Sequence, residues 1–436
     1  MIPLVTKRFS LLGDVKEYVA SPIDYLSKKT KEYGDTFRFR IAGRYVTFTG
    51  DPELIKEILQ TKNKSFRKSK SYRKLELLLG KGLFTSEGDF WLKQRRLIQP
   101  AFSNTKLAHY TKQIDQICEE KLNQINTSQA VNIKDVFTDL TLEIITQCLL
   151  GISSKEETQK VNRHLPRALS YMLNQITSPL APPLWFPIKS NNNFKDDVTE
   201  LNKLISGLIQ RKKKDLGQDL LSSLIEITDE DTGEKMSDQQ LIDETLTIFL
   251  AGHETTAITL TWFIYSLLKK PSYLDLVFEE CKEKPFHELM GNSMLKACLN
   301  ETMRLYSPIW VLGREPIQDL TINSYHLRQK EGVIFSPYLI HRDERFWKNP
   351  KQFYPERFIN NDYNEEHFIP FGGGPRLCIG KHFSILEMVI IIQKMMTKLG
   401  KPFIQNLPKE EFEYSLTLRP KQKIEVQFNI EKGNRL

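Results

Sequence analysis

Ten residues toward the C-terminal end of the chain read Phe371-Gly372-Gly373-Gly374-Pro375-Arg376-Leu377-Cys378-Ile379-Gly380. The glycines allow a tight turn and a close approach of the backbone to a flat ligand, and the proline fixes the direction of exit. Apolar residues then recur at helical spacing as far as Gly400, which predicts a helix that begins just after Cys378. Because the N-terminus of a helix favours a thiolate over a thiol, we interpret Cys378 as a ligand or a nucleophile.

Two other interpretations compete with a ligand role for Cys378. A nucleophilic cysteine needs a histidine beside it and a context such as Cys-Gly-Ser, which this loop lacks. A lone cysteine is commonly buried and inert. Against the inert cysteine stands the complete pattern Phe-x-x-Gly-x-Arg-x-Cys-x-Gly, filled by Phe371, Gly374, Arg376, Cys378 and Gly380. Arg376 also offers a permanent cation to a carboxylate next to a bound metal.

The pattern around Cys378 resembles the haem-binding signature of the cytochrome P-450 superfamily of haem-thiolate monooxygenases, in particular its soluble bacterial members. The resemblance covers nearly the whole chain. It implies a mainly α fold with a small β-rich lobe from the N- and C-terminal parts, in a single domain over residues 1–436. It also implies one haem b with Cys378 as the axial ligand of the iron, O2 as co-substrate, and haem contacts from Phe371, Gly374, Arg376 and Gly380.

Composition and charge narrow the class of protein. The 436 residues carry 62 basic and 54 acidic side chains, a net charge of +8 that is spread along the chain. No nucleic-acid-binding motif accompanies these charges, so we expect no nucleic-acid partner. The N-terminus contains neither the ~18 apolar residues of a membrane span nor a signal peptide. We therefore expect a cytoplasmic monomer without a membrane anchor.

The cysteines argue for the same compartment. Cys118, Cys148, Cys281, Cys298 and Cys378 form no close pairs and no Cys-x-x-Cys motif. An odd number of scattered cysteines argues against a disulfide scaffold and against a zinc site. A reducing compartment is therefore expected.

Local patterns predict several elements. Periodic and turn signals indicate a helix over residues 22–33, a hairpin over 36–49, and a helix that Asp51 caps and Pro52 begins. Amphipathic helices are expected over 153–176 and 194–226. Four prolines within residues 178–187 predict a connector, which is either a lid over an apolar pocket or a plain surface loop.

Ser237 and Gln240 form a capping-box pattern, and from Asp238 the chain is expected to stay helical until Pro271. Such a helix is roughly 50 Å long at about 1.5 Å per residue. Ala251 and Gly252 in its middle leave a low surface against which a flat ligand can lie.

The residues that follow Gly252 carry polar chemistry. His253-Glu254 does not begin a zinc-protease motif, because the required second histidine is replaced by Ala257. Thr255 can bond back to a carbonyl one turn earlier, as helical threonines commonly do. The resemblance instead implies that Thr255 holds dioxygen and water in a hydrogen-bond network and that Glu254 relays protons from solvent.

Three cations and a tryptophan are candidates for the haem propionates. Trp91 and Arg95 lie four residues apart, so an indole N–H and a guanidinium share one helix face. Taken alone, the pair reads as a partly buried tryptophan beside a solvated arginine. The resemblance implies instead that both donate to a propionate, with Arg314 as a further propionate-binding cation and Arg376 beside the metal.

Glu301 and Arg304 are three residues apart on a predicted helix, a spacing worth only tenths of a kcal/mol when such a pair is exposed. The resemblance implies a buried ionic trio with Arg357 and a structural role. Trp310, Val311 and Leu418 are expected to line the substrate pocket.

The implied reaction is insertion of one oxygen atom from O2 into a C–H bond of a small, largely apolar substrate, as hydroxylation or O-dealkylation. Fatty acids, terpenoids and methyl ethers all remain open as substrates. Nucleotide fingerprints are absent, so electrons are expected from a separate ferredoxin or flavodoxin with its NAD(P)H reductase. A peroxide-using peroxygenase and a non-catalytic haem sensor are the alternatives.

Overall fold

This computed structural model describes residues 2–6, 13–152, 154–177 and 181–429. Helices dominate and the strands form small sheets, so the expected mainly α class with a small β-rich part is confirmed. The chain separates into two compact units, each assembled from stretches that are distant in sequence. The first unit comprises Met1–Lys70, Asn292–Cys378 and Glu410–Lys421, and the second comprises Ser71–Gly291, Ile379–Lys409 and Gln422–Leu436. A single domain over residues 1–436 stays a prediction.

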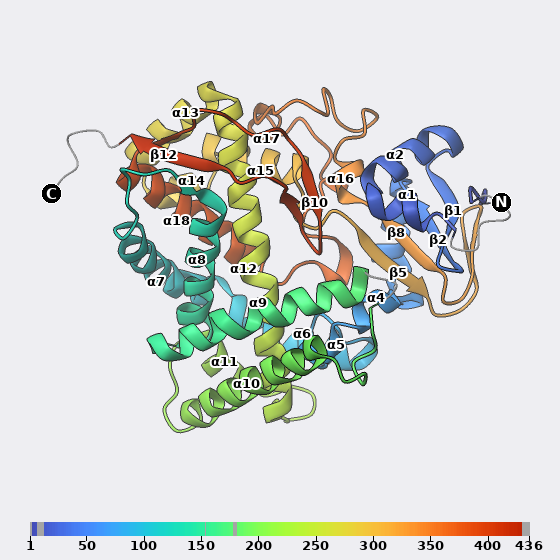
Figure 1. Cartoon of the computed structure of the whole chain (residues 1–436), viewed down its shortest axis with the longest axis horizontal. Helices are drawn as coiled ribbons and strands as arrows, with labels where there is room; N and C mark the ends of the chain where they lie inside the picture. Colours follow the sequence, from blue (N-terminus) through green and yellow to red (C-terminus); the bar gives the residue numbers. More distant parts are fainter. Residues whose placement is uncertain (1, 7–12, 153, 178–180, 430–436) are drawn as a thin grey trace. The chain divides into compact units, whose positions relative to one another are not determined.

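The first unit is built on a five-stranded sheet (Figure 1). Its strands lie in the order β1 (Thr36–Ile41), β2 (Arg44–Thr49), β8 (Gly332–Phe335), β5 (Leu312–Pro316) and β3 (Phe66–Lys68). Neighbouring strands are antiparallel except β2 and β8, which are parallel. β1 and β2 form the expected hairpin. Ala42 and Gly43 both have positive φ in its turn, as a two-residue hairpin loop of this kind requires.

Smaller elements complete the first unit. Two strand pairs are β6 (Leu320–Ile322) with β7 (Tyr325–Leu327), and β10 (Phe412–Tyr414) with β11 (Leu418–Pro420). The helices are α1 (Val15–Ala20), α2 (Pro22–Tyr33), α3 (Pro52–Lys56), α15 (Met294–Leu305), α16 (Pro337–Ile340) and α17 (Glu356–Ile359). As expected, the Asp51 carboxylate caps α3 by accepting the backbone N–H groups of Glu53 and Leu54. A π-helical turn over Glu57–Thr61 follows α3 directly.

Two apolar clusters lie against the elements of the first unit. In one, the sheet residues Phe37, Phe39 and Phe48 pack on Tyr25 and Leu26 of α2. In the other, side chains of α3 and its π-helical turn pack on β8, including Leu54, Ile58, Leu59, Val333 and Phe335. The second cluster reaches Ile369, which precedes the cysteine loop.

The second unit consists mostly of helices. They are α4 (Lys70–Arg73, whose first residue belongs to the first unit), α5 (Glu76–Leu79), α6 (Gly88–Ile98), α7 (Asn104–Leu122), α8 (Ile133–Ile144), α9 (Lys155–Thr177), α10 (Lys189–Lys212), α11 (Leu220–Glu226), α12 (Asp238–Lys269), α13 (Pro271–Glu283), α14 (Phe286–Leu289) and α18 (Lys381–Leu399). A small sheet places β12 (Glu425–Asn429) between β4 (Val131–Asn132) and β9 (Lys401–Phe403).

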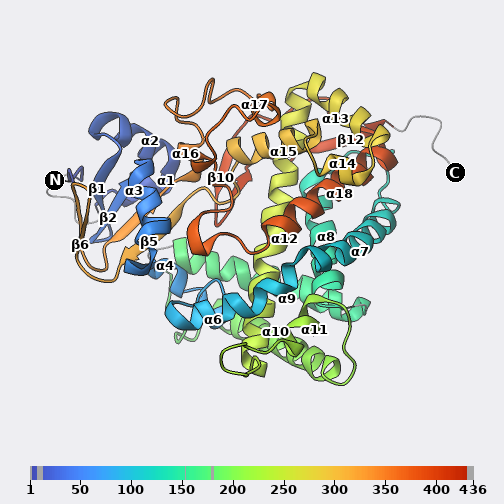
Figure 2. The ribbon, with the colours of Figure 1, turned by 180° about the vertical axis from the view of Figure 1, so that it is seen from behind.

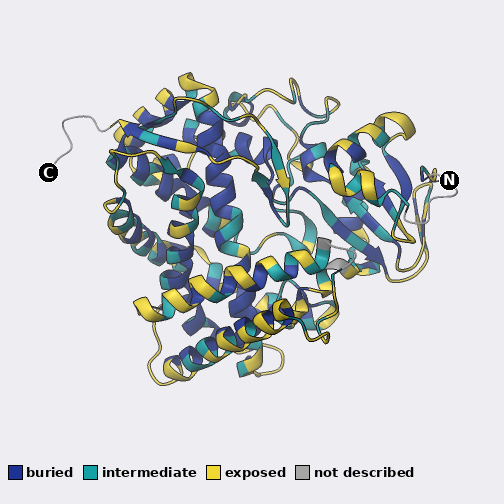
Figure 3. Cartoon of the chain, in the orientation of Figure 1, coloured by how far each residue is buried: buried dark blue, intermediate teal, exposed yellow. Residues whose placement is uncertain are grey.

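The long helix α12 runs through the middle of the second unit (Figures 1 and 2). It packs on α8 and contacts α18, while α18 packs on α7. The predicted capping box is confirmed, because Gln240 N–H donates to the Ser237 hydroxyl and the Gln240 side chain accepts the Ser237 N–H. α12 is buried over most of its length, whereas α9 and α10 each present an exposed face (Figure 3).

The expected helix over residues 194–226 is wrong at its centre. The structure divides it into α10 and α11, because α10 ends at Lys212 and Asp219 caps a new helix by accepting Ser222 N–H at 2.9 Å. The Lys212 ammonium donates to the same carboxylate at 2.6 Å, which ties the two helices together. Gly217 followed by Asp219 was the stop-and-start signal that the apolar period concealed.

The proline-rich connector lies partly outside the described residues, which omit 178–180. Its described part, 181–187, is not helical, as the prolines predict. Within the described part of the chain, no helix is long and apolar enough to cross a membrane.

Candidate active site

The predicted site residues are divided between the two units. The first unit holds the loop from Phe371 to Cys378, the carboxylate–arginine trio, Arg314 and the predicted pocket residues; the second holds Gly380, α6 with Trp91 and Arg95, and the central part of α12.

Backbone hydrogen bonds close the loop that carries Cys378. The Cys378 N–H donates to the Phe371 carbonyl at 3.1 Å, and the Leu377 N–H donates to the Gly374 carbonyl at 3.0 Å. α18 begins only at Lys381, so Cys378 precedes the first helical residue by three positions. These bonds fix the backbone at Cys378 and at the residue before it, which helps to present the cysteine side chain in one direction.

Gly374 is required by the shape of the loop. Its φ is +65°, and a Cβ atom there would lie 1.9 Å from the Leu59 carbonyl oxygen. Gly372 also has a positive φ of +74°, but a Cβ atom there would meet no protein atom within 4 Å. Gly374 therefore lets the loop touch the π-helical turn after α3, whereas Gly372 serves the turn itself.

The five cysteines are not equivalent. Cys118, Cys148, Cys281 and Cys298 are buried, whereas Cys378 is exposed. Burial raises the pKa of the Cys118, Cys148 and Cys281 thiols, which therefore stay protonated at neutral pH. An axial ligand needs a sulfur atom that protein atoms do not cover, and Cys378 meets this requirement.

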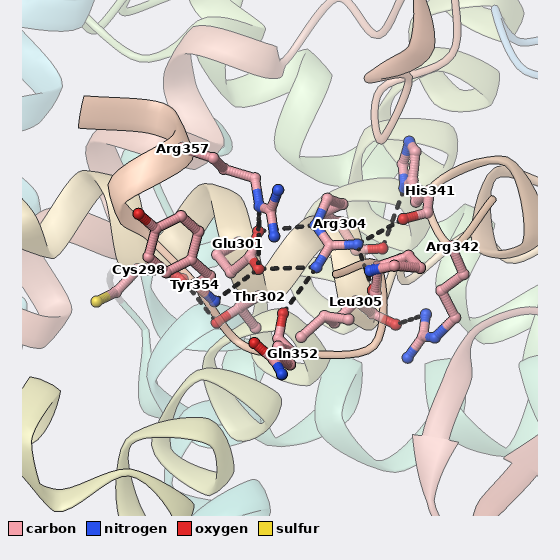
Figure 4. Close-up of polar contacts among 11 residues, drawn as sticks. Cys298, Glu301, Thr302, Arg304, Leu305, His341, Arg342, Gln352, Tyr354 and Arg357 are labelled. Atoms are coloured by element: carbon pink, nitrogen blue, oxygen red, sulfur yellow. Dashed lines mark hydrogen bonds and ion pairs between the residues drawn. The ribbon is translucent and has the colours of Figure 1, made fainter. Parts of the chain in front are cut away.

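The predicted trio of Glu301, Arg304 and Arg357 is brought together in the interior of the first unit (Figure 4). The Arg304 Nε and Nη2 atoms each donate to a Glu301 oxygen at 2.7 Å, and the Arg357 Nε lies 3.2 Å from Glu301 Oε2. All three side chains are buried. Burial lowers the pKa of Arg357, and the Glu301 charge opposes that shift.

Further groups that the sequence reasoning missed complete this network. The Tyr354 N–H donates to Glu301 Oε1 at 2.8 Å. Arg304 Nη1 donates to the carbonyls of His341 and Pro350, and its Nη2 donates to that of Gln352 (Figure 4). The carbonyl acceptors come from segments 37 to 48 residues away, so no local pattern could indicate them.

Trp310, Val311 and Leu418 come together in one apolar cluster of the first unit. Leu418 is fully buried, and the Trp310 indole N–H donates to the Ser415 carbonyl at 3.0 Å. Such packing gives these side chains a core role in addition to any contact with substrate, and the pocket assignment stays a prediction. Arg314 lies on β5, opposite Val333 of β8 and Lys68 of β3.

In the second unit, Trp91 and Arg95 share one face of α6, as their spacing predicts. Trp91 is buried and Arg95 is half-buried. An indole ring held by packing beside a partly accessible guanidinium can present two donors to one anion.

In the middle of α12, several threonine hydroxyls donate hydrogen bonds to backbone carbonyls. The hydroxyl of Thr255 donates to the Ala251 carbonyl at 2.7 Å, and that of Thr259 donates to the Thr255 carbonyl at 2.8 Å. The hydroxyl of Thr141 on α8 donates to the His253 carbonyl at 3.0 Å. The same bond to a carbonyl one turn earlier recurs at Thr245 and Thr261, so Thr255 bonds as helical threonines commonly do, and its role in binding dioxygen and water stays a prediction.

Accessibility also changes at this point of α12. Ala251 is exposed, and Gly252, Glu254 and Thr255 are half-buried, within a helix whose other central residues are buried. A Cβ atom at Gly252 would lie 2.6 Å from the Ile145 side chain, so this glycine serves helix packing. The uncovered surface that the sequence assigned to Ala251 and Gly252 together therefore belongs mainly to Ala251.

Glu387 on α18 is a buried acid that the sequence reasoning missed. It is fully buried, and among the described residues no group completes a hydrogen bond of good geometry to either carboxyl oxygen. Burial raises the pKa of Glu387 well above its usual range, an effect only partly offset by the nearby Thr256 hydroxyl. Burial therefore favours the protonated form of this carboxyl group.

Comparison with known proteins identifies the family. The family model for cytochrome P-450 matches residues 3–428 of the chain. The chain belongs to the cytochrome P-450 family. It is accordingly a cytochrome P-450 monooxygenase with a haem-thiolate cofactor, and as such it takes a substrate and receives electrons from a redox partner.

Relatives of this cytochrome P-450 have diverse names. Cyclooctatin synthase of Streptomyces melanosporofaciens is 27% identical over 395 residues, covering 88% of this chain and 86% of that protein. Cytokinin hydroxylase of Arabidopsis thaliana is 29% identical over 433 residues, covering 91% and 82%. The crystal structure of the cytochrome P450DA heme domain is 24% identical and has a TM-score of 0.87, covering 99% of this chain and 98% of that one. The last comparison confirms the fold.

The described residues fit a haem-thiolate cofactor. Cys378 is the one cysteine of the five that is exposed, and it sits in a loop whose backbone is fixed. Ala251 is exposed although most of the residues of α12 are buried, so a bound group could cover the helix at this point. Arg314, Arg376 and Arg95 are half-buried cations, the type of group that a propionate pairs with.

Proposed function

We propose that Cys378 is the axial thiolate ligand and that this monooxygenase inserts oxygen into a C–H bond of a small, largely apolar substrate. The main support for this assignment is that Cys378 is exposed in its fixed loop, whereas the other four cysteines are buried. When bound, the haem supplies activation of O2, and a thiolate ligand favours cleavage of the O–O bond. The protein contributes orientation, proton delivery and exclusion of water.

Glu254 and Thr255 are the proposed proton-delivering pair. The Thr255 hydroxyl gives its hydrogen to the Ala251 carbonyl, so its oxygen keeps lone pairs that can accept a hydrogen bond from water. Glu254, the residue before Thr255, is half-buried and can exchange protons with solvent.

The proposed haem contacts fall into groups with different roles. Trp91, Arg95 and Arg314 donate to the propionates, and Arg376, which belongs to the ligand loop, offers a permanent cation to a haem carboxylate. Phe371, Gly374 and Gly380 shape that loop, and Ala251 with Gly252 forms the surface of α12 that faces the cofactor. The buried trio of Glu301, Arg304 and Arg357 holds the structure without taking part in the chemistry.

Hydroxylation or O-dealkylation is the proposed outcome for the substrate. The predicted pocket residues Trp310, Val311 and Leu418 belong to an apolar cluster, which favours a hydrophobic substrate over a charged one. One relative, cytokinin hydroxylase of Arabidopsis thaliana, is named for a hydroxylation, which supports this reaction. Titration with fatty acids, terpenoids and methyl ethers, followed by the low- to high-spin change of the haem, identifies the class.

Electrons are proposed to come from a separate ferredoxin or flavodoxin with its NAD(P)H reductase, in the cytoplasm. Such carriers are acidic, and the net charge of +8 suits their docking to a monomer of this chain. Attraction of this kind weakens with salt. A reduction rate that did not change with ionic strength would contradict the electrostatic part of the proposal.

Replacement of the ligand tests the function directly. Cys378→Ser should abolish the thiolate-type carbon-monoxide spectrum of the reduced protein and its turnover with O2. Cys281→Ala provides the matched control, since Cys281 is buried on α13 and should leave both properties unchanged. A Cys378→Ser protein that kept the parent spectrum would end the proposal.

Substitution of Thr255 separates the monooxygenase from the alternatives. Thr255→Ala should divert electrons to peroxide or water, so less product forms per NAD(P)H consumed. Thr255→Ser keeps the hydroxyl and should retain coupling. A peroxygenase would turn over with peroxide equally well in both variants, and a haem sensor would show no substrate-dependent turnover at all.

A further inference from the structure

His341 lies at the C-terminal end of α16 and is fully buried in the first unit. Both ring nitrogens are engaged. Nδ1 lies 3.2 Å from the Arg304 carbonyl oxygen, and the backbone N–H of Ile369 donates to Nε2 at 2.9 Å. Figure 4 shows His341 beside Arg304, whose Nη1 donates to the His341 carbonyl at 2.5 Å.

These contacts determine the state of the imidazole. A backbone N–H can only donate, so Nε2 must be unprotonated to accept from Ile369. A carbonyl can only accept, so the proton resides on Nδ1 and points to Arg304. The ring is therefore the neutral Nδ1–H tautomer. Burial, reinforced by the Arg304 charge, lowers the pKa of His341 well below its usual value, consistent with a neutral ring.

The bond to Ile369 is placed at the base of the loop that carries Cys378. Ile369 is followed by Pro370, which has no N–H, so the Ile369 N–H is the last donor before the loop sequence begins. The Ile369 carbonyl accepts from Gly372 N–H at 3.1 Å. The Phe371 carbonyl in turn accepts from Cys378 N–H. Ile369 is thus held on both its backbone groups.

We propose that His341 is a positioning residue, which ties the base of the Cys378 loop to the buried Glu301–Arg304 pair and so holds the sulfur atom in place. This inference rests on the proposed role of Cys378 as the axial ligand. His341 touches neither the cysteine nor any reacting group, so it acts only through the loop.

Packing alone does not explain a histidine here. The ring contacts Trp347 and Phe368, with centroids 6.1 Å and 5.6 Å away, and an apolar residue of similar size could fill the same space. An apolar residue would remove the acceptor of the Ile369 N–H, which is half-buried, and loss of a partner at such a site is unfavourable. The requirement is therefore for an acceptor at the place of Nε2.

Two substitutions separate the two ring contacts. In His341→Gln the side-chain amide reaches the place of Nε2 and can accept from Ile369, but the contact with the Arg304 carbonyl is lost. In His341→Asn the shorter amide can donate to the Arg304 carbonyl, but Ile369 has no acceptor. Both variants remove an aromatic ring, so each serves as the control of the other for packing.

Measurements on the haem-loaded full chain distinguish the outcomes. In His341→Asn, hydrogen exchange at the Ile369 amide and loss of the thiolate-type carbon-monoxide spectrum should both accelerate about tenfold or more relative to His341→Gln. Equal rates in the two variants would overturn the inference. If either variant fails to fold, the 15N shifts of the wild-type imidazole decide, since a charged ring or an Nε2–H tautomer also overturns it.

The Cys378→Ser result keeps this test separate from that of the proposed function. If that variant retains the parent spectrum, the ligand assignment fails and the positioning role fails with it. If it loses the spectrum while the Gln and Asn variants of His341 behave alike, only the positioning inference fails.

Discussion

Arg304 binds both carboxylate oxygens of Glu301, each at 2.7 Å, and neither side chain is exposed to solvent. The pair has i,i+3 spacing on α15. Lys29 and Glu32 on α2 have the same spacing and lie 3.1 Å apart, but their side chains are 15% and 40% exposed. Because water screens the second pair and not the first, burial rather than spacing decides the strength of such a pair.

Glu301→Gln should therefore destabilise the protein far more than Glu32→Gln. Loss of the Glu301 charge leaves Arg304 and Arg357 buried without their counter-ion, at a cost of about 3–5 kcal/mol. Loss of the exposed Glu32 charge should change stability by less than ~0.5 kcal/mol. Denaturant unfolding of the two variants measures both values. Similar losses of stability in the two variants would show that water screens the Glu301 ion pairs as it screens the exposed pair.

Gly374→Ala should disrupt the cysteine loop more than Gly372→Ala. Both residues have positive φ, so both substitutions carry the strain of a left-handed backbone, about 1 kcal/mol or more. Only at Gly374 would the new Cβ also collide with a backbone carbonyl, that of Leu59. Thermal unfolding and the fraction of protein that retains haem report the difference. Equal stability and equal haem retention in the two variants would contradict the predicted collision with the Leu59 carbonyl.

Ser237→Ala should cost about 1 kcal/mol, because it removes the hydroxyl that accepts the Gln240 N–H at the start of α12. Ser103 precedes α7 in the same position, but its side chain makes no capping hydrogen bond. Ser103→Ala should therefore leave stability nearly unchanged. Urea denaturation of both proteins provides the comparison, and a larger loss from Ser103→Ala would contradict it.

Glu387→Gln should alter how stability depends on pH. Burial raises the pKa of Glu387 in the folded protein, whereas the unfolded chain releases the proton above about pH 4.3. Between the unfolded and folded pKa values the native state binds more protons, so the contribution of Glu387 to stability falls as pH rises.

The Gln variant keeps a neutral side chain at every pH and should lack this decline. The melting temperatures of wild type and Glu387→Gln should therefore be similar at pH 5 and should differ more as pH rises to 8. At pH 8 the variant should be the more stable protein. Asp139→Asn on α8 is a control for the removal of a carboxylate, since Asp139 is exposed to solvent, and it should leave the pH dependence of stability nearly unchanged. Parallel curves for wild type and Glu387→Gln would show that Glu387 is ionised in the folded state.

Short-range features of this protein were readable from the sequence. The capping box of α12, the cap of α3 by Asp51 and the β1–β2 hairpin all depend on residues within a few positions of one another. The cysteine loop is equally local, because its turn follows from glycines that tolerate positive φ. The prediction of one helix over residues 194–226 was wrong, because a continuous apolar period concealed the end of α10 and the start of α11.

By itself, the sequence determined the elements, the loop around Cys378 and the family to which the loop belongs, since these depend on local backbone geometry and on residue spacing. Only the tertiary structure decided which groups lose contact with water. Glu301 meets Arg357 across 56 residues, and His341 meets Ile369 across 28. Contacts between distant segments bury the ion pair and Glu387, which strengthens the pair and raises the pKa of the acid, and they supply the partners that set the tautomer of His341.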